Sequence, residues 1–264
     1  MERRQFLTAS LAATALSLTR EASAQPQSSM RREFYLIRRY NLASGPETRL
    51  TEDYFGNALI PALSRMSMGP VGAFRLDIGP ETPQFYLLVP GASADALATL
   101  DLQLAKDEGF MKQVSAYWNA TAAAPAFQRI ESSLLIAFEG WPKVTPPAST
   151  ATKGKRIFQL RTYESPSDLE HIRKVEMFHH GEFEYFQRSG CHPVFFGDTL
   201  IGSRMPCLTY MLSFEDTAAL DSGWQKFRND PDWKKLSADP RYAFDPIVSN
   251  ISNLVLSPLN CSQI

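Results

Sequence analysis

Glu176 and His179 have the best spacing for acid–base chemistry in this sequence, because they stand three residues apart in a segment with helical periodicity. Residues three apart on a helix are neighbours on its surface. The apolar positions that define one face of a predicted helix over 167–189 are Leu169, Ile172, Val175, Phe183 and Phe186. Glu176 and His179 fall on the same face, where an unpaired ionisable group is costly. They must therefore pair with each other, bond to Tyr or Arg side chains of a sheet, or line a cavity.

A cavity is the functional interpretation of this pair. His179 would then act as a general base, Glu176 would orient it, and Tyr163 would complete the catalytic group. The alternative is a satisfied structural pair. Glu176-x-x-His179 also has the spacing of a helical metal motif. A di-metal site needs a second such motif, but Asp53 and Gly56 stand at the positions 123 residues earlier (176 − 53 = 179 − 56 = 123), so we expect no metal.

A second group of candidates stands at predicted strand ends and in a loop. Arg offers a fork of donors suited to carboxylates, and Tyr offers a phenol for hydrogen bonding. Strand ends open onto the rim of a barrel, and Arg204, in a hairpin loop, could serve there as a gate. The alternative for Arg161 is a structural ion pair with Glu164 or Glu176. The candidate substrate-binding residues are Arg161, Glu164, Arg204 and Tyr40.

The elements that must position these residues occur twice. The segment 33–40 (EFYLIRRY) is echoed by 156–163 (RIFQLRTY), with Arg38 on Arg161 at an offset of 161 − 38 = 123. The same offset places Leu97 on Leu220, Phe110 on Trp233 and, one residue out, Tyr86 on Tyr210. A single long period indicates duplication of a whole folding unit. We expect a first repeat over 31–140, a proline-containing linker over 141–155 and a second repeat over 156–258.

Each repeat predicts the order strand, helix, strand, strand, helix, strand. This is the ferredoxin-like α+β arrangement. The predicted strands are 33–41, 71–78, 84–89 and 129–138, then 156–163, 193–198, 207–213 and 248–256; the helical segments are 50–66, 93–118, 167–189 and 215–236. Two such sheets in one chain can cover each other and close, which removes their exposed edges. We therefore expect two tandem ferredoxin-like repeats packed as an internal, pseudodimeric α/β barrel.

Several motifs cluster in the second repeat. They are Leu160–Glu164 (LRTYE), Pro193–Gly197 (PVFFG), Arg204–Pro206 (RMP) and Asp230–Trp233 (DPDW). Together they resemble the NIPSNAP family, whose domains belong to the dimeric α/β-barrel superfamily. The resemblance covers about 155–258 and implies the ferredoxin-like fold. It implies no reaction, because fold does not specify function; relatives in the superfamily include cofactor-free monooxygenases, haem-degrading enzymes and non-enzymatic binders. Within the motif, Asp230 is the expected N-cap of a helix that Pro231 begins.

The first 24 residues predict an export signal. Arg3-Arg4 is followed by Phe6-Leu7, a short apolar run and Ala22-Ser23-Ala24, which matches a signal-peptidase site. We expect twin-arginine export to the periplasm or the medium; a Sec signal and a retained anchor are the alternatives. No other segment is apolar enough to span a membrane, which takes about 20 residues.

Composition excludes several classes of function. The 264 residues carry a formal net charge of −1 and no basic block, so we expect no nucleic-acid partner. No Gly-rich phosphate loop, Gly-x-Ser-x-Gly elbow or supported Cys–His arrangement occurs, which disfavours nucleophilic catalysis. We expect no cofactor. The three cysteines match no zinc pattern, although Cys191 and Cys207 could face each other across a hairpin.

Three interpretations of function follow. The first is an exported NIPSNAP-like protein with a pocket for a small apolar or aromatic molecule, marked by a cavity of about 300 Å³ or more near His179. The second is a non-catalytic structural or partner-binding protein, marked by a filled barrel and a broad exposed apolar patch. The third is a cofactor-free monooxygenase-like or haem-handling enzyme. Pairing with further copies of the chain is compatible with each.

Overall fold

The computed structural model describes residues 31–264, so the predicted export signal lies outside the described residues. Eight antiparallel strands close into one barrel in the order β1-β3-β2-β8-β5-β7-β6-β4. The strands are β1 Phe34–Asn41, β2 Gly72–Ile78, β3 Gln84–Gly91, β4 Arg129–Ala137, β5 Ile157–Glu164, β6 His192–Ile201, β7 Cys207–Phe214 and β8 Asn250–Pro258. Each repeat contributes four strands, and the β2–β8 and β4–β6 pairings join the repeats. The predicted internal barrel of two ferredoxin-like repeats is confirmed.

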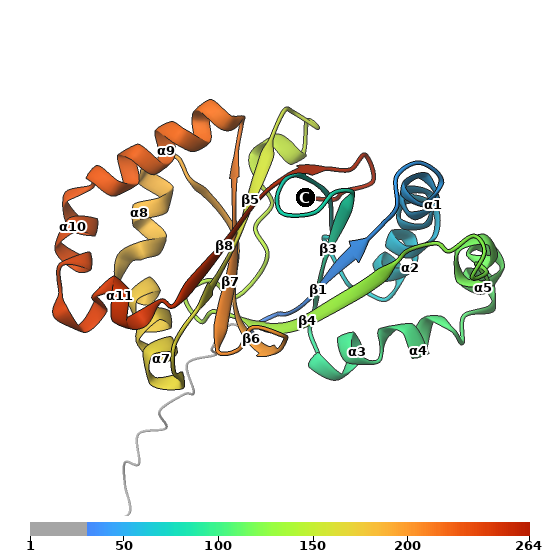
Figure 1. The fold of residues 1–264 in the computed structure, drawn as a ribbon, viewed down its shortest axis with the longest axis horizontal. Coiled ribbons are helices and arrows are strands. Elements are labelled where there is room, and N and C mark those ends of the chain that lie inside the picture. Colours follow the sequence, from blue (N-terminus) through green and yellow to red (C-terminus); the bar gives the residue numbers. More distant parts are fainter. Residues whose placement is uncertain (1–30) are drawn as a thin grey trace, which may run out of the picture. The chain divides into compact units, whose positions relative to one another are not determined.

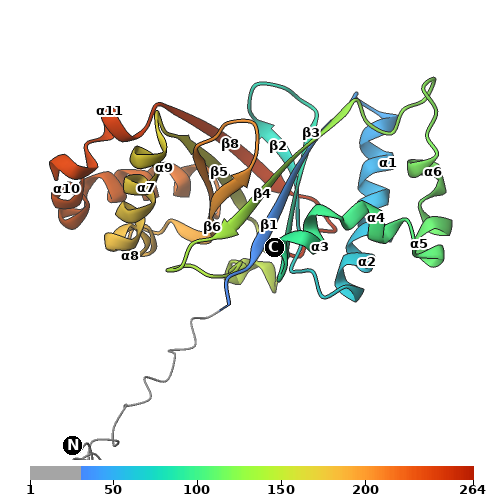
Figure 2. The same ribbon diagram turned by 90° about the horizontal axis from the view of Figure 1, so that it is seen from below.

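Helices cover the barrel on two opposite sides (Figure 1), and the turned view shows the same two layers (Figure 2). The first repeat supplies α1 Pro46–Tyr54, a π-helical turn Phe55–Leu59, α2 Ile60–Arg65, α3 Ala94–Ala98, α4 Leu100–Leu104, α5 Glu108–Gln113 and α6 Ser115–Trp118. The second supplies α7 Asp168–Met177, a π-helical turn Phe178–Glu182, α8 Phe183–Arg188, α9 Thr217–Asn229, α10 Pro231–Ser237 and α11 Phe244–Ile247. No helix among the described residues is long and apolar enough to cross a membrane.

Equivalent elements of the two repeats begin 123 residues apart in the sequence. Strands β1 and β5 begin at Phe34 and Ile157 (157 − 34 = 123). The two π-helical turns begin at Phe55 and Phe178 (178 − 55 = 123). The capping residues of α5 and α10, Asp107 and Asp230, keep the same spacing (230 − 107 = 123). The repeat therefore extends to irregular details of the helices.

One expected correspondence is wrong. Tyr210 stands 123 residues after Leu87 (210 − 87 = 123), and not after Tyr86. Tyr86 lines the hollow interior of the barrel, whereas Tyr210 belongs to the apolar cluster under the second helix layer. Alternate residues of a strand face opposite sides, so a slip of one residue reverses the face.

The strands bury both of their faces. One apolar cluster lies under each helix layer, and a third fills part of the barrel interior, which we call the lumen. Along β1, Leu36 and Tyr40 pack under the helices while Tyr35 faces the lumen. The same alternation sends Phe158 of β5 into the lumen and Tyr163 under the helices. This alternation decides which candidate residues can meet a ligand inside the barrel.

The chain's last residues close one end of the lumen. Leu259 and Gln263 donate backbone hydrogen bonds of 2.9 Å to Ala73 and Val71 of the first repeat. Ile264 is fully buried in the lumen cluster, and Arg156 donates to its carbonyl at 2.9 Å. Any ligand of the lumen must therefore enter from the opposite end.

The predicted continuous helix over 167–189 is wrong, and its error propagates to the candidate site. The π-helical turn Phe178–Glu182 interrupts it, and Gly181 inside this turn has φ 120°. The wider turn shifts the helical phase, so one 3.6-residue face cannot run through both halves. Leu169 and Ile172, placed on the buried face by the sequence, are 57% and 60% exposed. His171 and Lys174 take the buried positions instead.

Candidate functional site

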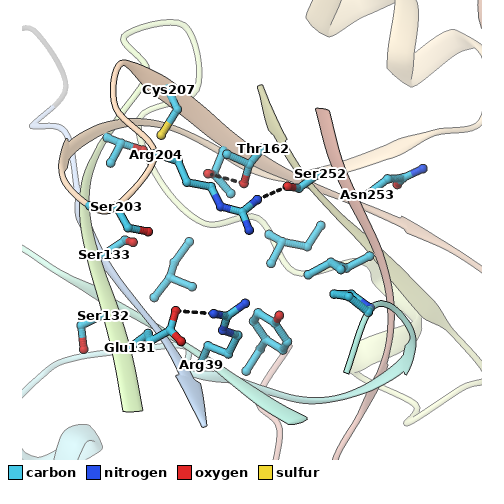
Figure 3. Close-up of a pocket in the computed structure, with 18 residues that line it drawn as sticks. Arg39, Glu131, Ser132, Ser133, Thr162, Ser203, Arg204, Cys207, Ser252 and Asn253 are labelled. Atoms are coloured by element: carbon cyan, nitrogen blue, oxygen red, sulfur yellow. Dashed lines mark hydrogen bonds and ion pairs between the residues drawn. The ribbon is translucent and has the colours of Figure 1, made fainter. Parts of the chain in front are cut away.

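A cavity of about 630 Å³ occupies the open end of the lumen (Figure 3). Its walls come from both repeats and combine two guanidinium groups, one carboxylate and many hydroxyls with a few apolar side chains. The lining residues are Ile37, Arg39, Pro80, Tyr86, Glu131, Ser132, Ser133, Leu160, Thr162, Thr199, Gly202, Ser203, Arg204, Cys207, Thr209, Ser252, Asn253 and Leu254. The volume lies within the usual range of small-molecule sites.

Strand register and one hairpin loop position the polar walls. Arg39 on β1 lies directly opposite Glu131 on β4, and both reach the lumen. On the other wall, Thr162 of β5 pairs with Thr209 of β7. Arg204 comes from the loop between β6 and β7, at the mouth. Figure 3 shows the Arg39 and Arg204 guanidinium groups on opposite sides of the cavity.

The Arg39 wall is an ion-paired cluster. Arg39 Nη2 contacts Glu131 Oε2, and Arg129 Nε donates to Glu131 Oε1 at 2.8 Å. Partial burial raises the pKa of Glu131, but hydrogen bonds from Arg129 and Arg39 outweigh it and hold that pKa below its ordinary value. Glu131 is therefore a fixed anion that two cations share, which leaves positive charge for a ligand.

Arg204 is held more loosely. Its Nη1 contacts Ser252 Oγ and lies 3.6 Å from Glu164 Oε1, and 46% of its side chain is exposed. Asn250 Nδ2 also donates to Glu164 Oε1, at 2.9 Å. A solvent-exposed pair at this distance contributes little free energy. Arg204 can therefore exchange these contacts for a ligand at small cost.

The remaining polar groups suit hydrogen bonding rather than bond cleavage. The Thr162 and Thr209 hydroxyls lie 2.9 Å apart, and Tyr86 Oη donates to Gln84 Oε1 at 3.2 Å. Burial raises the pKa of the Cys207 thiol, which keeps it protonated and weakly nucleophilic. The lining residues include no histidine or lysine. The arrangement can bind an anion with hydroxyl or carbonyl groups.

Glu176 and His179, the predicted catalytic pair, do not meet. Glu176 binds Arg241 at 3.1 and 2.5 Å and accepts from Tyr242 Oη at 2.9 Å. These hydrogen bonds, with Arg241 first, lower the pKa of Glu176. His179 is exposed; its Nε2 accepts from Gly140 N–H at 3.2 Å, so its Nδ1 donates to Val175 O at 2.9 Å. The expectation that both point at the sheet is wrong, because it assumed an unbroken helix.

Three other candidates lie under the helices rather than at the lumen. Arg161 Nη2 donates to Tyr163 Oη at 3.0 Å, and Tyr163 Oη lies 2.9 Å from Tyr210 Oη. Tyr40 is buried in the corresponding layer of the first repeat. Of the predicted binding residues, only Arg204 lines the cavity, and Glu164 lies beside it.

Sequence reasoning missed Arg39, Glu131, Thr162 and Thr209. The signal in the sequence was that successive side chains of a strand point to opposite faces of the sheet. Arg38 and Tyr40 both face the helices, but Arg39 stands between them. Applied to each strand, this alternation would have separated lumen-facing polar residues from helix-facing ones. It could not have shown which lumen positions meet at the open end, because that depends on pairing between the repeats.

The cysteines and the possible metal ligands can be located in the described part of the chain. Residues 31–264 contain no group of three or more His, Cys, Asp or Glu side chains that could hold a metal ion. Cys191 and Cys207 are free: the first packs under the second helix layer, and the second lines the lumen cavity. They point to opposite faces of the sheet, so the disulfide considered from the sequence does not form.

Comparison with known proteins supports the fold and finds a family likeness in the second repeat. Residues 158–263 match the NIPSNAP family model, which confirms the resemblance of the second repeat and leaves the first repeat outside the match. No curated protein matches the sequence.

Solved structures give the wider likeness. A candidate monooxygenase from Lactobacillus acidophilus is 11% identical over 86% of this chain and 94% of its own, with a TM-score of 0.55. A second, from Fusobacterium nucleatum, is 9% identical over 87% of this chain and 94% of its own, also with a TM-score of 0.55. A NIPSNAP-like domain protein from Burkholderia xenovorans is 15% identical over 40% of this chain and 86% of its own, with a TM-score of 0.35. The two structures with a TM-score of 0.55 show a likeness of fold alone.

Proposed function

We propose that this chain, whose second repeat is a NIPSNAP domain, binds a small organic anion in the open end of its barrel and does not transform it. The single observation that carries the proposal is the pair of guanidinium groups, Arg39 and Arg204, facing each other across a cavity of about 630 Å³. Two opposed guanidinium groups match a short dicarboxylate or a hydroxy acid, since each can bind a carboxylate through two parallel hydrogen bonds.

The charge balance of the mouth supports an anion. Arg39, Arg129 and Arg204 are offset there by the carboxylates of Glu131 and Glu164. One positive charge remains, while the hydroxyls around it can serve a ligand's own hydroxyl or carbonyl groups. The two guanidinium groups favour a ligand that carries a negative charge over the wholly apolar or aromatic one expected from the sequence.

Binding by calorimetry to purified protein tests the proposal, with succinate, malate and citrate as probes. We expect saturable binding to at least one probe. We expect Arg39→Gln and Arg204→Gln each to weaken it by about tenfold or more, because each removes a charge-assisted contact. Arg65→Gln is the matched control, since Arg65 is exposed and pairs with Asp107 outside the lumen. Equal affinity in all three variants, or no binding of any probe, would contradict the proposal.

We also propose that the protein is exported by the twin-arginine route. The support is the Arg3-Arg4 pair before an apolar run and an Ala-x-Ala site. Replacing both arginines with lysine should leave the precursor in the cytoplasm of the producing bacterium, as seen by fractionation and immunoblotting. Unchanged export of that variant would point to the Sec route.

We also propose that the chain can pair with further copies of itself. The barrel closes within one chain, so no second copy is needed to complete it. Any homo-oligomer would use the outer surface, and light scattering of the purified protein decides whether one forms.

A further inference from the structure

The first repeat serves as an internal control for a buried polar cluster in the second. Residues 123 positions apart occupy equivalent places in the two repeats. At four of these places under the helices, the two repeats carry side chains of different chemical type. Thr51, Leu59, Leu87 and Asp101 of the first repeat are replaced by Lys174, Glu182, Tyr210 and Trp224 of the second. Because both repeats fold alike, these four replacements are not demanded by the fold.

Both repeats carry an arginine under their helices, Arg38 in the first and Arg161 in the second. In the first repeat a carboxylate neutralises this arginine. Arg38 Nη1 and Nη2 each donate to one carboxylate oxygen of Asp101, both at 2.9 Å. This is the bidentate geometry in which an arginine–carboxylate pair is strongest.

Its counterpart, Arg161, has no such carboxylate. Trp224 stands where Asp101 would be, and the Arg161 guanidinium lies 4.4 Å from the centre of the Trp224 ring. Its hydrogen bond goes instead to the Tyr163 phenol, at 3.0 Å. Arg161 thus keeps its charge without a bound counter-ion.

The carboxylate in this layer is already engaged by another cation. Glu182 lies 3.0 and 3.3 Å from Lys174 Nζ, and their side chains are only 2% and 3% exposed. Two cations therefore share one carboxylate. Burial raises the pKa of Glu182, against the effect of Lys174, and a proton on Glu182 would only enlarge the positive surplus.

A hydrogen-bond donor is also left over. Tyr163 Oη and Tyr210 Oη lie 2.9 Å apart, so one phenol donates to the other. Tyr163 Oη also receives the Arg161 hydrogen bond. Whichever phenol donates, the second O–H group has no acceptor among the described residues, and Tyr210 is fully buried. Buried donors without acceptors are uncommon and costly.

The unpaired positive charge of Arg161 and the free phenol O–H group lie at one place, and together they could bind an anion. We propose that the second repeat holds a small inorganic anion beside Arg161, Tyr163 and Tyr210, at a site separate from the lumen. Arg161 and Trp224 are half-buried, so the site is within reach of solvent at the margin of α9. The class of ligand is a halide or an oxyanion of similar size, because aromatic side chains fill most of the surrounding layer.

Bromide is a suitable probe, since it is located by its anomalous X-ray scattering. In crystals of the full chain grown in sodium bromide, we expect an anomalous peak within hydrogen-bond distance of Arg161 or the two phenols. In solution at constant ionic strength, replacing gluconate by bromide should change tryptophan fluorescence saturably, because Trp224 stacks on Arg161.

Two variants make the test specific. Arg161→Gln should weaken the bromide response by about tenfold or more, because the charge is lost. In crystals of Trp224→Asp grown in sodium bromide the anomalous peak should be absent, because the variant rebuilds the carboxylate partner that Arg38 has in the first repeat. Arg39→Gln and Arg204→Gln, which change only the lumen, should leave it intact.

The inference is overturned if wild-type crystals show no bromide peak in the second helix layer. It is also overturned if the solution response of folded Arg161→Gln equals that of the wild type. Because the peak is sought in the wild-type chain, a variant that fails to fold does not remove the test.

Discussion

At the scale of single residues, the buried pair Lys174 and Glu182 occurs only in the second repeat, so we can test whether the fold requires it. Removing one partner of a buried pair leaves an uncompensated charge, which typically costs about 3–5 kcal/mol. We therefore expect Glu182→Leu to lower the free energy of unfolding by about that amount. The double variant Lys174→Thr, Glu182→Leu restores the first-repeat residues and should stay within about 1 kcal/mol of the wild type, because replacing a whole buried pair is often neutral.

Urea unfolding of the wild type and both variants checks this prediction. If the double variant is as unstable as the single one, the pair is needed to build the second helix layer, and the comparison between the repeats fails at this position.

Asp230 gives a prediction about pH, because the folded state favours the charged form of its carboxyl group. Its carboxylate accepts hydrogen bonds from the backbone N–H groups of Asp232 and Trp233 and binds Arg188. Hydrogen bonds from Arg188 lower the pKa of Asp230; burial opposes them, the backbone N–H groups of Trp233 and Asp232 add to them, and the pKa is held at about 2. The folded state thus holds this proton less tightly than the unfolded state does, where the pKa is near 3.8.

The stability from Asp230 is therefore present above pH 3.8 and is lost as the pH falls toward 2. We expect Asp230→Asn to reduce the slope of unfolding free energy against pH between about 4 and 2, as measured by denaturation at several pH values. Asn keeps the cap, so the variant should cost less at neutral pH than Asp230→Ala, for which a cap loss of about 1 kcal/mol is typical. An unchanged slope would show that the carboxylate does not govern this acid range.

At the scale of elements, the sequence predicted where the strands and the helical segments lie, but not the breaks inside the helices. Each predicted strand corresponds to an observed one because alternation and a repeated motif both signal strands. The predicted helix over 167–189 is three pieces, α7, a π-helical turn and α8. A periodicity of 3.6 residues carries no sign of a π turn, so the predicted face was turned away from the real one. That error placed His179 and Glu176 in a cavity that they do not line.

The turn itself depends on Gly181. This residue has φ 120°, and a Cβ atom there would lie 2.5 Å from the Tyr185 hydroxyl. Gly181→Ala should therefore destabilise the chain by about 1–3 kcal/mol through backbone strain and crowding together. Gly190→Ala is the matched control, because Gly190 also has positive φ (82°) but no neighbour within 4 Å of the added atom.

Thermal and urea denaturation of the two glycine variants give the comparison. We expect the larger loss for Gly181→Ala. Equal losses would mean that backbone conformation alone, and not contact with Tyr185, sets the cost of a side chain in the turn.

At the scale of the whole molecule, the lumen exists only because two repeats meet. Arg39 and Glu131 come from the first repeat, and Thr162, Thr209 and Arg204 come from the second. The sequence predicted that the sheets would cover each other, since each repeat alone leaves a bare face. It could not predict which residues meet at the open end, because the β2–β8 and β4–β6 registers, each with a shift, set that geometry.

The same dependence predicts how one repeat behaves alone. A fragment over 155–264 keeps β5 to β8 but loses the partners of β6 and β8, so two edge strands and the lumen-facing side of its sheet meet water. Exposed edges favour pairing with another chain, and in the full chain β4 and β8 occupy equivalent places in the two repeats. Two fragments can therefore close a barrel by pairing β8 of each with β6 of the other. We expect light scattering to give twice the fragment mass at micromolar concentration. A folded monomer would show instead that one repeat can tolerate an open sheet, and that closure of the barrel is not what holds the repeats together.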